Sequence, residues 1–179
     1  VKKNKDDHQY VLNIGRLTEQ KNQKILINSF KEISKKYKKL KLYILGEGEK
    51  FLELSNLIEE LNLKTKIKFL GHIDSPYEYI KGSLCVLVTS LWEDPGFVMI
   101  EASALKKIVI SSNCPSGPKE FYKNGATGFL FKNNNKLSLI NTFNKFMGSK
   151  KTKINFFIKE SYNKSLEYSE IEHTKSLRK

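Results

Sequence analysis

Short apolar runs of strand length alternate with segments of helical periodicity along most of this chain. The first run, Tyr10–Ile14, ends at Gly15 and is followed by apolar residues that recur on one helical face: Leu26, Phe30, Ile33 and Tyr37. Further strands are predicted over 40–45, 67–70, 84–88, 108–111 and 128–131, with helical segments between them. This alternation predicts an α/β, Rossmann-like fold, in which helices cover both faces of a parallel sheet. Ligands of such folds bind beyond the carboxyl ends of the strands.

The length of 179 residues is enough for one domain with a substantial core. We expect residues 10–148 to form the Rossmann-like domain and residues 149–179 to form a C-terminal helical extension. The extension carries a group of apolar residues near Phe157, so its apolar side needs a partner surface. Residues 1–9 are mostly polar or charged, and we expect them to be a linker from a preceding N-terminal domain.

The formal net charge is +13, from 32 basic and 19 acidic residues. Arg16 and Arg178 are the only arginines, whereas proteins that read bases rely on arginine forks. We therefore expect no nucleic-acid partner. The lysine-rich stretches 35–39 and 150–153 fit peripheral contact with an anionic membrane, and a solvated basic surface is the alternative interpretation.

Two cysteines, Cys85 and Cys114, are too few and too far apart for a disulfide scaffold or a zinc site. This cysteine usage fits a reduced, cytoplasmic protein. Such a protein could act at the inner face of the cell membrane. The sequence has no HExxH motif and no DxD pair, so we expect no dedicated metal site.

The segment 90–102, SLWEDPGFVMIEA, carries two acids around a turn and a helix start. Glu93 falls in the predicted loop and Glu101 on the predicted helix. Backbone N–H groups at the helix start would lie between them. A sugar nucleotide matches this pattern, because its hydroxyls suit the acids and its phosphates suit the N–H groups. An ordinary capped helix is the alternative interpretation.

Two further strand ends carry candidate ligand groups. After the first strand, Gly15 allows a sharp turn, and Arg16 and Lys21 would form an anion site beside a helix N-terminus. The alternative is two solvated surface cations. After the second strand, Gly46 begins a Gly-Glu-Gly turn that completes neither GxGxxG nor a P-loop, so it either lines a ligand or only joins strand to helix.

In their order along the chain, these motifs resemble a known family. Four motifs come after the first four predicted strands, in the order GRLTEQK, LGEGE, FLGHI and SLWEDPGFVMIEA. Two more come later in the chain, SSNCPSGPKE and NGATGFLF. Together they resemble the C-terminal, donor-binding half of glycosyltransferase family 4, over about residues 10–131. Those enzymes have the GT-B fold, in which two Rossmann-like domains face each other across a cleft. The resemblance implies that this chain is one half of a GT-B fold.

The resemblance also implies roles for single residues. Arg16 and Lys21 match the pair that neutralises the donor diphosphate. Glu93 and Glu101 match the E-x7-E motif, in which the first acid contacts the donor sugar and the second holds the ribose hydroxyls. The catalytic set implied is Glu93, Arg16 and Lys21.

The remaining substrate-binding residues implied are Gly15, Gly46, Ile73, Gly96, Phe97 and Val98, of which Ile73 falls where a backbone group meets the base. The chain departs from the usual Glu-Gly-Phe-Gly of the family at Glu93-Asp94-Pro95-Gly96. Because Pro95 has no N–H, one donor of the usual loop is lost.

The activity implied is retaining transfer of a hexose or N-acetylhexosamine from a nucleotide sugar to a hydroxyl acceptor. We expect a UDP-sugar, with GDP-mannose as the runner-up, and neither a metal nor another cofactor. The acceptor would be a glycan or lipid-linked glycan of bacterial surface polysaccharide synthesis, held by the N-terminal domain. The chain alone would then bind donor but transfer little sugar. The alternative is a non-catalytic nucleotide-binding or interaction module of the same fold.

Overall fold

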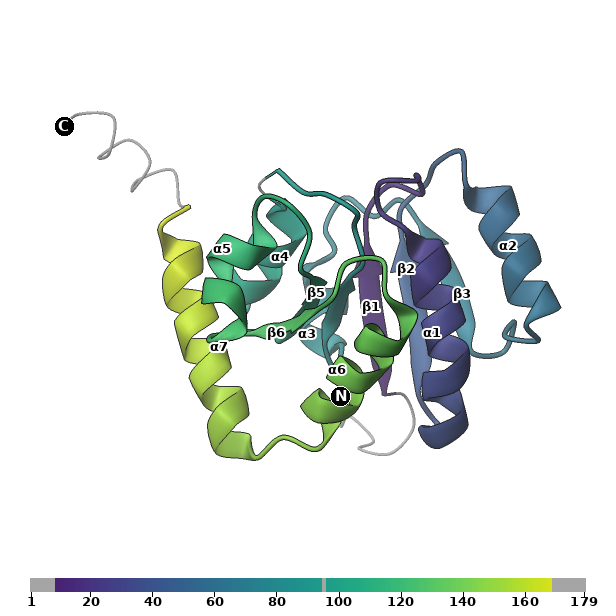
Figure 1. The fold of residues 1–179 in the computed structure, drawn as a ribbon. Helices are drawn as coiled ribbons and strands as arrows, with labels where there is room; N and C mark the ends of the chain where they lie inside the picture. Colours follow the sequence, from purple (N-terminus) through teal and green to yellow (C-terminus); the bar gives the residue numbers. More distant parts are fainter. Residues whose placement is uncertain (1–8, 95, 169–179) are drawn as a thin grey trace, which may run out of the picture.

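The computed structural model in Figure 1 describes residues 9–94 and 96–168. Its centre is a six-stranded sheet of parallel strands in the order β3-β2-β1-β4-β5-β6. The strands are β1 (Tyr10–Ile14), β2 (Lys41–Leu45), β3 (Ile67–Gly71), β4 (Val86–Val88), β5 (Val109–Ser112) and β6 (Phe129–Phe131). The predicted α/β, Rossmann-like sheet is thus confirmed.

Strand β4 is shorter than the apolar run 84–88 that predicted it. The two residues before it still pair with β1, because the Leu84 N–H donates to the Tyr10 carbonyl over 2.7 Å and the Cys85 carbonyl accepts from the Leu12 N–H over 3.1 Å. The apolar run therefore marks the whole length along which this segment lies beside β1. Only its second part also has strand pairing with β5.

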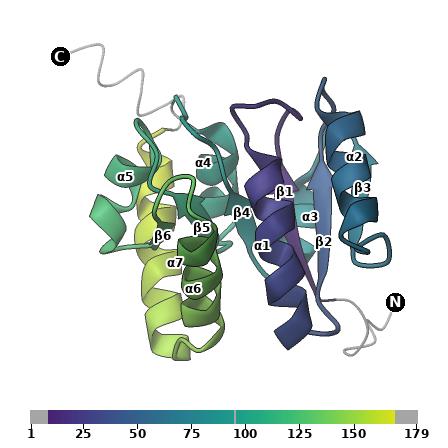
Figure 2. The same ribbon diagram turned by 45° about the vertical axis from the view of Figure 1, so that its right-hand side comes forward.

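Helices cover both faces of the sheet (Figures 1 and 2). The helices are α1 (Gln23–Lys36), α2 (Phe51–Glu60), α3 (Tyr77–Gly82), α4 (Phe97–Ala104), α5 (Pro118–Phe121), α6 (Lys136–Met147) and α7 (Lys151–Leu166), with a 3-10 turn at Lys123–Gly125. One face is covered by α1, α2 and α6, and the other by α3 and α4. The alternation of strand side chains produces this division: Val11 belongs to the first layer and its neighbour Leu12 to the second.

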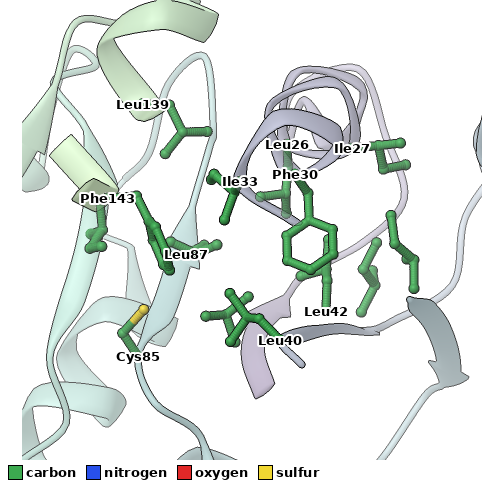
Figure 3. Close-up of a cluster of buried hydrophobic side chains, with 14 of the residues drawn as sticks. Leu26, Ile27, Phe30, Ile33, Leu40, Leu42, Cys85, Leu87, Leu139 and Phe143 are labelled. Carbon is green, nitrogen blue, oxygen red and sulfur yellow. The ribbon is translucent and has the colours of Figure 1, made fainter. Parts of the chain in front are cut away.

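The first apolar layer lies between α1, α6 and the centre of the sheet (Figure 3). The predicted helical face of α1 points Leu26, Phe30 and Ile33 into it, and all three are buried. Phe143 of α6 meets them from the other side, beside Leu87 of β4. Burial of each such side chain contributes roughly 1.5–3 kcal/mol, so this layer holds α1 and α6 on the sheet.

Helix α7 lies along the β6 edge of the sheet (Figure 1). Its Phe157 is 5% exposed and packs edge-on against Phe129 of β6, with ring centroids 5.0 Å apart. Lys106 Nζ lies over the ring of Tyr162, 4.7 Å from the ring centroid. The partner surface that the apolar side of this helix requires is therefore supplied, at least in part, by its own chain. The predictions for residues 1–8 and 169–179 lie outside the described residues.

The order of the strands creates a switch point between β1 and β4. The chain runs outward from β1 through β2 to β3, then returns to β4 and runs the other way. Loops that leave neighbouring strands in opposite directions open a crevice at the carboxyl ends, where ligands of such sheets bind. Buried Asn13 joins the two strands here, since its Nδ2 donates to the Leu87 carbonyl over 2.8 Å.

The carboxyl ends of β1, β2 and β3 are joined by backbone hydrogen bonds that glycine N–H groups donate. The Gly46 N–H donates to the Gly71 carbonyl over 2.7 Å, and the Gly15 N–H donates to the Leu45 carbonyl over 3.0 Å. Gly46 has φ +132°, and a β-carbon there would overlap the carbonyl oxygen of Gly15. The close approach of these strand ends therefore requires glycine at position 46.

We predict that Gly46→Ala destabilises the protein by about 2–4 kcal/mol, because it adds both backbone strain and a clash with Gly15. Gly148→Ala is the matched control: Gly148 has φ −90° and its nearest contact would be at 3.5 Å, so its change should stay within about 0.5 kcal/mol. Urea unfolding of both variants measures the difference. Equal stability of the two would contradict this account of the strand ends.

Candidate functional site

The candidate site lies at the carboxyl ends of β1 and β4, on either side of the switch point. Backbone and side-chain bonds fasten the loop after β4 to the loop after β1. The Leu91 N–H donates to the Gln20 carbonyl over 2.8 Å, and Thr89 Oγ1 donates to the Lys21 carbonyl over 2.9 Å. The two loops therefore form one surface, although 68 residues separate Thr89 from Lys21.

An ion pair between Lys21 and Glu93 occupies the centre of this surface. Lys21 Nζ lies 2.7 Å from Glu93 Oε1, and the two side chains are 19% and 8% exposed. Ser90 Oγ donates to the same carboxylate oxygen. The Lys21 stem passes over Gly15, at 3.4 Å from where a β-carbon would stand. Two predicted site residues thus meet directly, which their sequence separation gave no means of predicting.

The second oxygen of Glu93 is open. Among the described residues no donor bonds to Oε2, which lies 3.7 Å from where a β-carbon would stand on Gly96. Gly96 has φ +88° and precedes α4 without a side-chain cap, so the first N–H groups of that helix keep their hydrogen-bonding capacity. Phe97 is exposed and Val98 is half-buried at this helix start. Pro95 lies outside the described residues.

Arg16 is an exposed cation in the same loop as Lys21. Its guanidinium forms no ion pair with any residue that the structure describes. Its backbone is fixed by Gln23, which is 1% exposed and donates through Nε2 to the Arg16 carbonyl over 3.0 Å. Gln23, the first residue of α1, was missed by the sequence analysis, because its glutamine side chain has no motif around it that marks a backbone contact.

Glu101 lies on α4, about one turn from the start of that helix. The residue is exposed, yet partial desolvation raises the pKa of its carboxyl above the ordinary value. It forms no ion pair within residues 9–94 and 96–168. No described residue therefore competes with an incoming hydroxyl donor for its carboxyl group.

Two other predicted residues lie at the same edge of the sheet. Gly46 follows β2 directly, and its N–H donates to the Gly71 carbonyl at the junction of the strand ends. Ile73 follows β3, is half-buried and packs against the second apolar layer, so its side chain is committed to the core. Between them, Glu47 Oε1 accepts from the His72 N–H over 3.4 Å, which joins the loops after β2 and β3.

Several supporting contacts were also absent from the sequence analysis. Ser112 Oγ donates to the Ser90 carbonyl over 2.6 Å, and Asn133 Nδ2 donates to the Leu91 carbonyl over 2.9 Å. The position of Ser90, three residues before Glu93, is a local pattern that could have suggested a side-chain bond. Asn133 comes after β6 and has no such signal.

The chemistry that this arrangement allows follows from its groups. Arg16, Lys21 and the start of α4 can receive an anion, and Glu93 and Glu101 can accept bonds from hydroxyls.

Within the described ranges, no three histidine, cysteine, aspartate or glutamate side chains gather in a metal-binding group. No helix among the described residues is long and apolar enough to cross a membrane.

Comparisons with known proteins agree on one family. Residues 1–164 match the family described as Glycosyl transferases group 1. An uncharacterized glycosyltransferase of Methanocaldococcus jannaschii is 47% identical over 109 residues, which are 61% of this chain and 27% of that protein. The N-acetylgalactosamine-N,N'-diacetylbacillosaminyl-diphospho-undecaprenol 4-alpha-N-acetylgalactosaminyltransferase of Campylobacter jejuni is 34% identical over 130 residues, 73% of this chain and 35% of that protein. The chain thus spans about a third or less of these relatives.

Solved structures show the same fold. One is a mutant of S. aureus TarM in complex with Fondaparinux, alpha-GlcNAc-glycerol and UDP. It has a TM-score of 0.80 at 25% identity, and the match covers 97% of this chain and 36% of the TarM chain. Anabaena Alr3699/HepE in complex with UDP has a TM-score of 0.83 at 22% identity, over 96% and 48% of the two chains. With most of its length matched by the family and its sheet matched by these structures, this chain belongs to the glycosyl transferases group 1 family and has the Rossmann-like fold of GT-B glycosyltransferases.

Proposed function

We propose that this chain is the donor-binding domain of a retaining glycosyltransferase, the C-terminal half of a family 4 enzyme. The observation that carries the proposal is the Lys21–Glu93 pair at the switch point. One oxygen of Glu93 is held by Lys21 and Ser90, and the other faces the glycine turn before α4. This places a cation, an open carboxylate oxygen and a helix start around one point, as a sugar diphosphate requires.

The diphosphate would be received by Arg16, Lys21 and the first N–H groups of α4. Arg16 offers a planar fork that no described carboxylate occupies, and Lys21 offers a point charge held in place by Glu93. In a retaining transfer the negative charge develops on the departing diphosphate. These groups would therefore stabilise the transition state by preorganised electrostatics, and we propose that they do so without a metal or another cofactor.

The hydroxyl groups would be received by the two acids. Glu101, exposed on α4, would accept both hydroxyls of the ribose. Glu93 would use Oε2 for a hydroxyl of the donor sugar while Oε1 stays with Lys21. Gly96, Phe97 and Val98 would contribute backbone, and Gly15, Gly46 and Ile73 would line the nucleotide from the neighbouring strand ends.

The relatives guide the choice of donor and acceptor. The Campylobacter jejuni relative is named for transfer of N-acetylgalactosamine to an undecaprenol-linked sugar, and the TarM structure contains UDP. We propose a UDP-linked hexose or N-acetylhexosamine as donor, and a glycan or lipid-linked glycan of surface polysaccharide synthesis as acceptor, held by an N-terminal domain. The protein would act in the cytoplasm, at the inner face of the membrane. In this proposal residues 1–9 are the linker, 10–148 the nucleotide-sugar domain and 149–179 the extension.

We predict that Arg16→Ala and Glu101→Gln each weaken binding of a UDP-sugar roughly 10–100-fold, the loss expected when one charge-assisted contact is removed. Isothermal titration with UDP-N-acetylglucosamine, GDP-mannose and ADP-glucose measures the affinities and identifies the nucleotide. Matched controls are Lys39→Ala and Glu60→Gln, exposed residues away from the carboxyl ends of the strands, which should leave the affinity unchanged. If both site variants bind like the wild type, the non-catalytic interaction module becomes the better interpretation.

We predict that donor affinity falls on acidification and begins to fall at a higher pH than an ordinary glutamate, with a pKa of about 4.3, would allow. The reason is the raised pKa of Glu101: its protonated form, which accepts ribose hydroxyls poorly, persists to higher pH. Titrations of the UDP-sugar at a series of pH values test this. Glu101→Gln should remove this part of the pH dependence, and Glu60→Gln should retain it. If the two variants have identical profiles of donor affinity against pH, Glu101 is not the group that binds the ribose.

We predict that the 179-residue chain binds the donor but transfers little or no sugar, because the proposed acceptor site belongs to the N-terminal domain. The measurement is UDP release with acceptor present, compared with binding of the same donor. Multiple turnovers at a rate of about 1 s⁻¹ or more, common among enzymes, would show that acceptor binding needs no such domain.

A further inference from the structure

Two lysine-rich stretches that are distant in sequence reach the same edge of the molecule. Lys36 Nζ and the Tyr37 hydroxyl, at the end of α1, both donate to Oδ1 of Asn144 in α6, over 3.3 and 3.0 Å. Lys36 and Asn144 are 108 residues apart in the chain. In Figures 1 and 2 the end of α1 and the turn between α6 and α7 both lie at the lower edge, away from the loops that follow the strands.

We call this surface the basic edge and define it by Lys36, Lys38, Lys39, Lys145, Lys150 and Lys151. All of these side chains are exposed. None of them forms an ion pair with another residue in the described part of the chain. The positive charge here is therefore not neutralised by the protein itself.

A general bias toward lysine does not account for this arrangement. Such a bias would act alike on the connections at both ends of the strands. The connections 36–41 and 147–151 at the basic edge carry lysines and no acid. The connections after the strands carry charges of both signs: six acids (Glu19, Glu47, Glu49, Asp74, Glu93 and Asp94) and five bases (Arg16, Lys21, Lys50, Lys132 and Lys136). Positive charge is therefore balanced by acids at that end of the strands and unbalanced in these two connections.

Helix stability does not account for it either. Cations favour helix C-termini, which suits Lys36 and Lys145. Lys150 and Lys151, however, are the N-cap and first residue of α7, where the helix end is itself positive. Lys38 and Lys39 lie beyond the end of α1. Lys150 and Lys151 therefore lack a local stabilising role, and an external anion would supply the reason for them.

We propose that the basic edge binds the surface of an anionic lipid bilayer. Clusters of four to eight lysines are typical of surfaces that attach to anionic lipids. Lysine is suited to this non-specific role, whereas arginine forks are preferred for nucleic acid, and Arg16, the one arginine in the described residues, lies at the other edge. The half-exposed ring of Phe156 on α7 adds an apolar group to this end of the molecule.

The proposed attachment has a consequence for orientation. Helix α1, 14 residues and about 21 Å long, runs from the strand-end loops to the basic edge. A bilayer bound at the basic edge would leave the candidate site pointing away from the lipid headgroups and free to receive a nucleotide sugar. This inference does not rest on the proposed activity, and the two can fail separately.

The test is co-sedimentation with vesicles of phosphatidylcholine alone and of phosphatidylcholine mixed with phosphatidylglycerol, at about 0.15 M salt. We expect the 179-residue chain to sediment only with the anionic vesicles. Lys150→Glu/Lys151→Glu should reduce this partitioning by roughly 30-fold or more, and Lys38→Glu/Lys39→Glu by a similar factor. Because acids suit a helix N-terminus, the first variant should be at least as stable as the wild type to heat.

The matched control is Lys132→Glu/Lys136→Glu, which makes the same charge change around the start of α6 at the opposite edge. It should lose much less vesicle binding than the basic-edge variants. The proposal is overturned if the wild type ignores anionic vesicles or if all three variants lose binding equally. It is also overturned if duplex DNA at the same salt binds more tightly than the vesicles and depends on the same lysines, since that would make nucleic acid the partner.

Discussion

Parallel pairing of all the strands is the constraint from which the other features of this molecule follow. It sends every strand-to-helix loop to one edge and every helix-to-strand connection to the other. The strand order then reverses between β1 and β4, so the loops after these strands separate at the centre of the first edge. Lys21 and Glu93 come from these two loops. The candidate site and the basic edge are therefore opposite ends of the same sheet.

The Lys21–Glu93 pair has two consequences of different kinds. Desolvation offsets much of the attraction in a largely buried pair, so it is weak evidence for stability. Its geometry is more informative, because Ser90 donates to the same oxygen and fixes the carboxylate from a second side. Lys21 is thus held before any ligand arrives. A diphosphate would add a second anion beside a cation already in position, so little ordering of the side chain would be needed at that moment.

The elements could be predicted from the sequence because each depends on a local pattern. Helix α1 follows from the spacing of Leu26, Phe30 and Ile33, and β1 from an apolar run that stops at glycine. The site could be predicted only as a set of strand-end motifs. That Lys21 and Glu93 touch depends on which strands are neighbours, and nothing in either loop encodes this. The role of Asn133 was missed for the same reason, since it follows β6 and bonds to the Leu91 carbonyl in the loop after β4. Gln23 bonds to Arg16 within its own loop and was missed because no local motif marks that contact.

The two acids of the site differ in how firmly each side chain is held before a ligand binds. Glu93 is almost fully buried and fixed by two donors, so accepting a hydroxyl at its open oxygen would cost little side-chain entropy. Glu101 is exposed and free of ion pairs with described residues, so binding would have to immobilise it, at about 0.5–1.5 kcal/mol. A fixed acceptor discriminates among hydroxyl positions, because a misplaced hydroxyl leaves it unpaired. A mobile acceptor adapts to the diol it meets. We therefore propose that Glu93 serves the choice of sugar, and that Glu101 captures the ribose that every nucleotide donor shares.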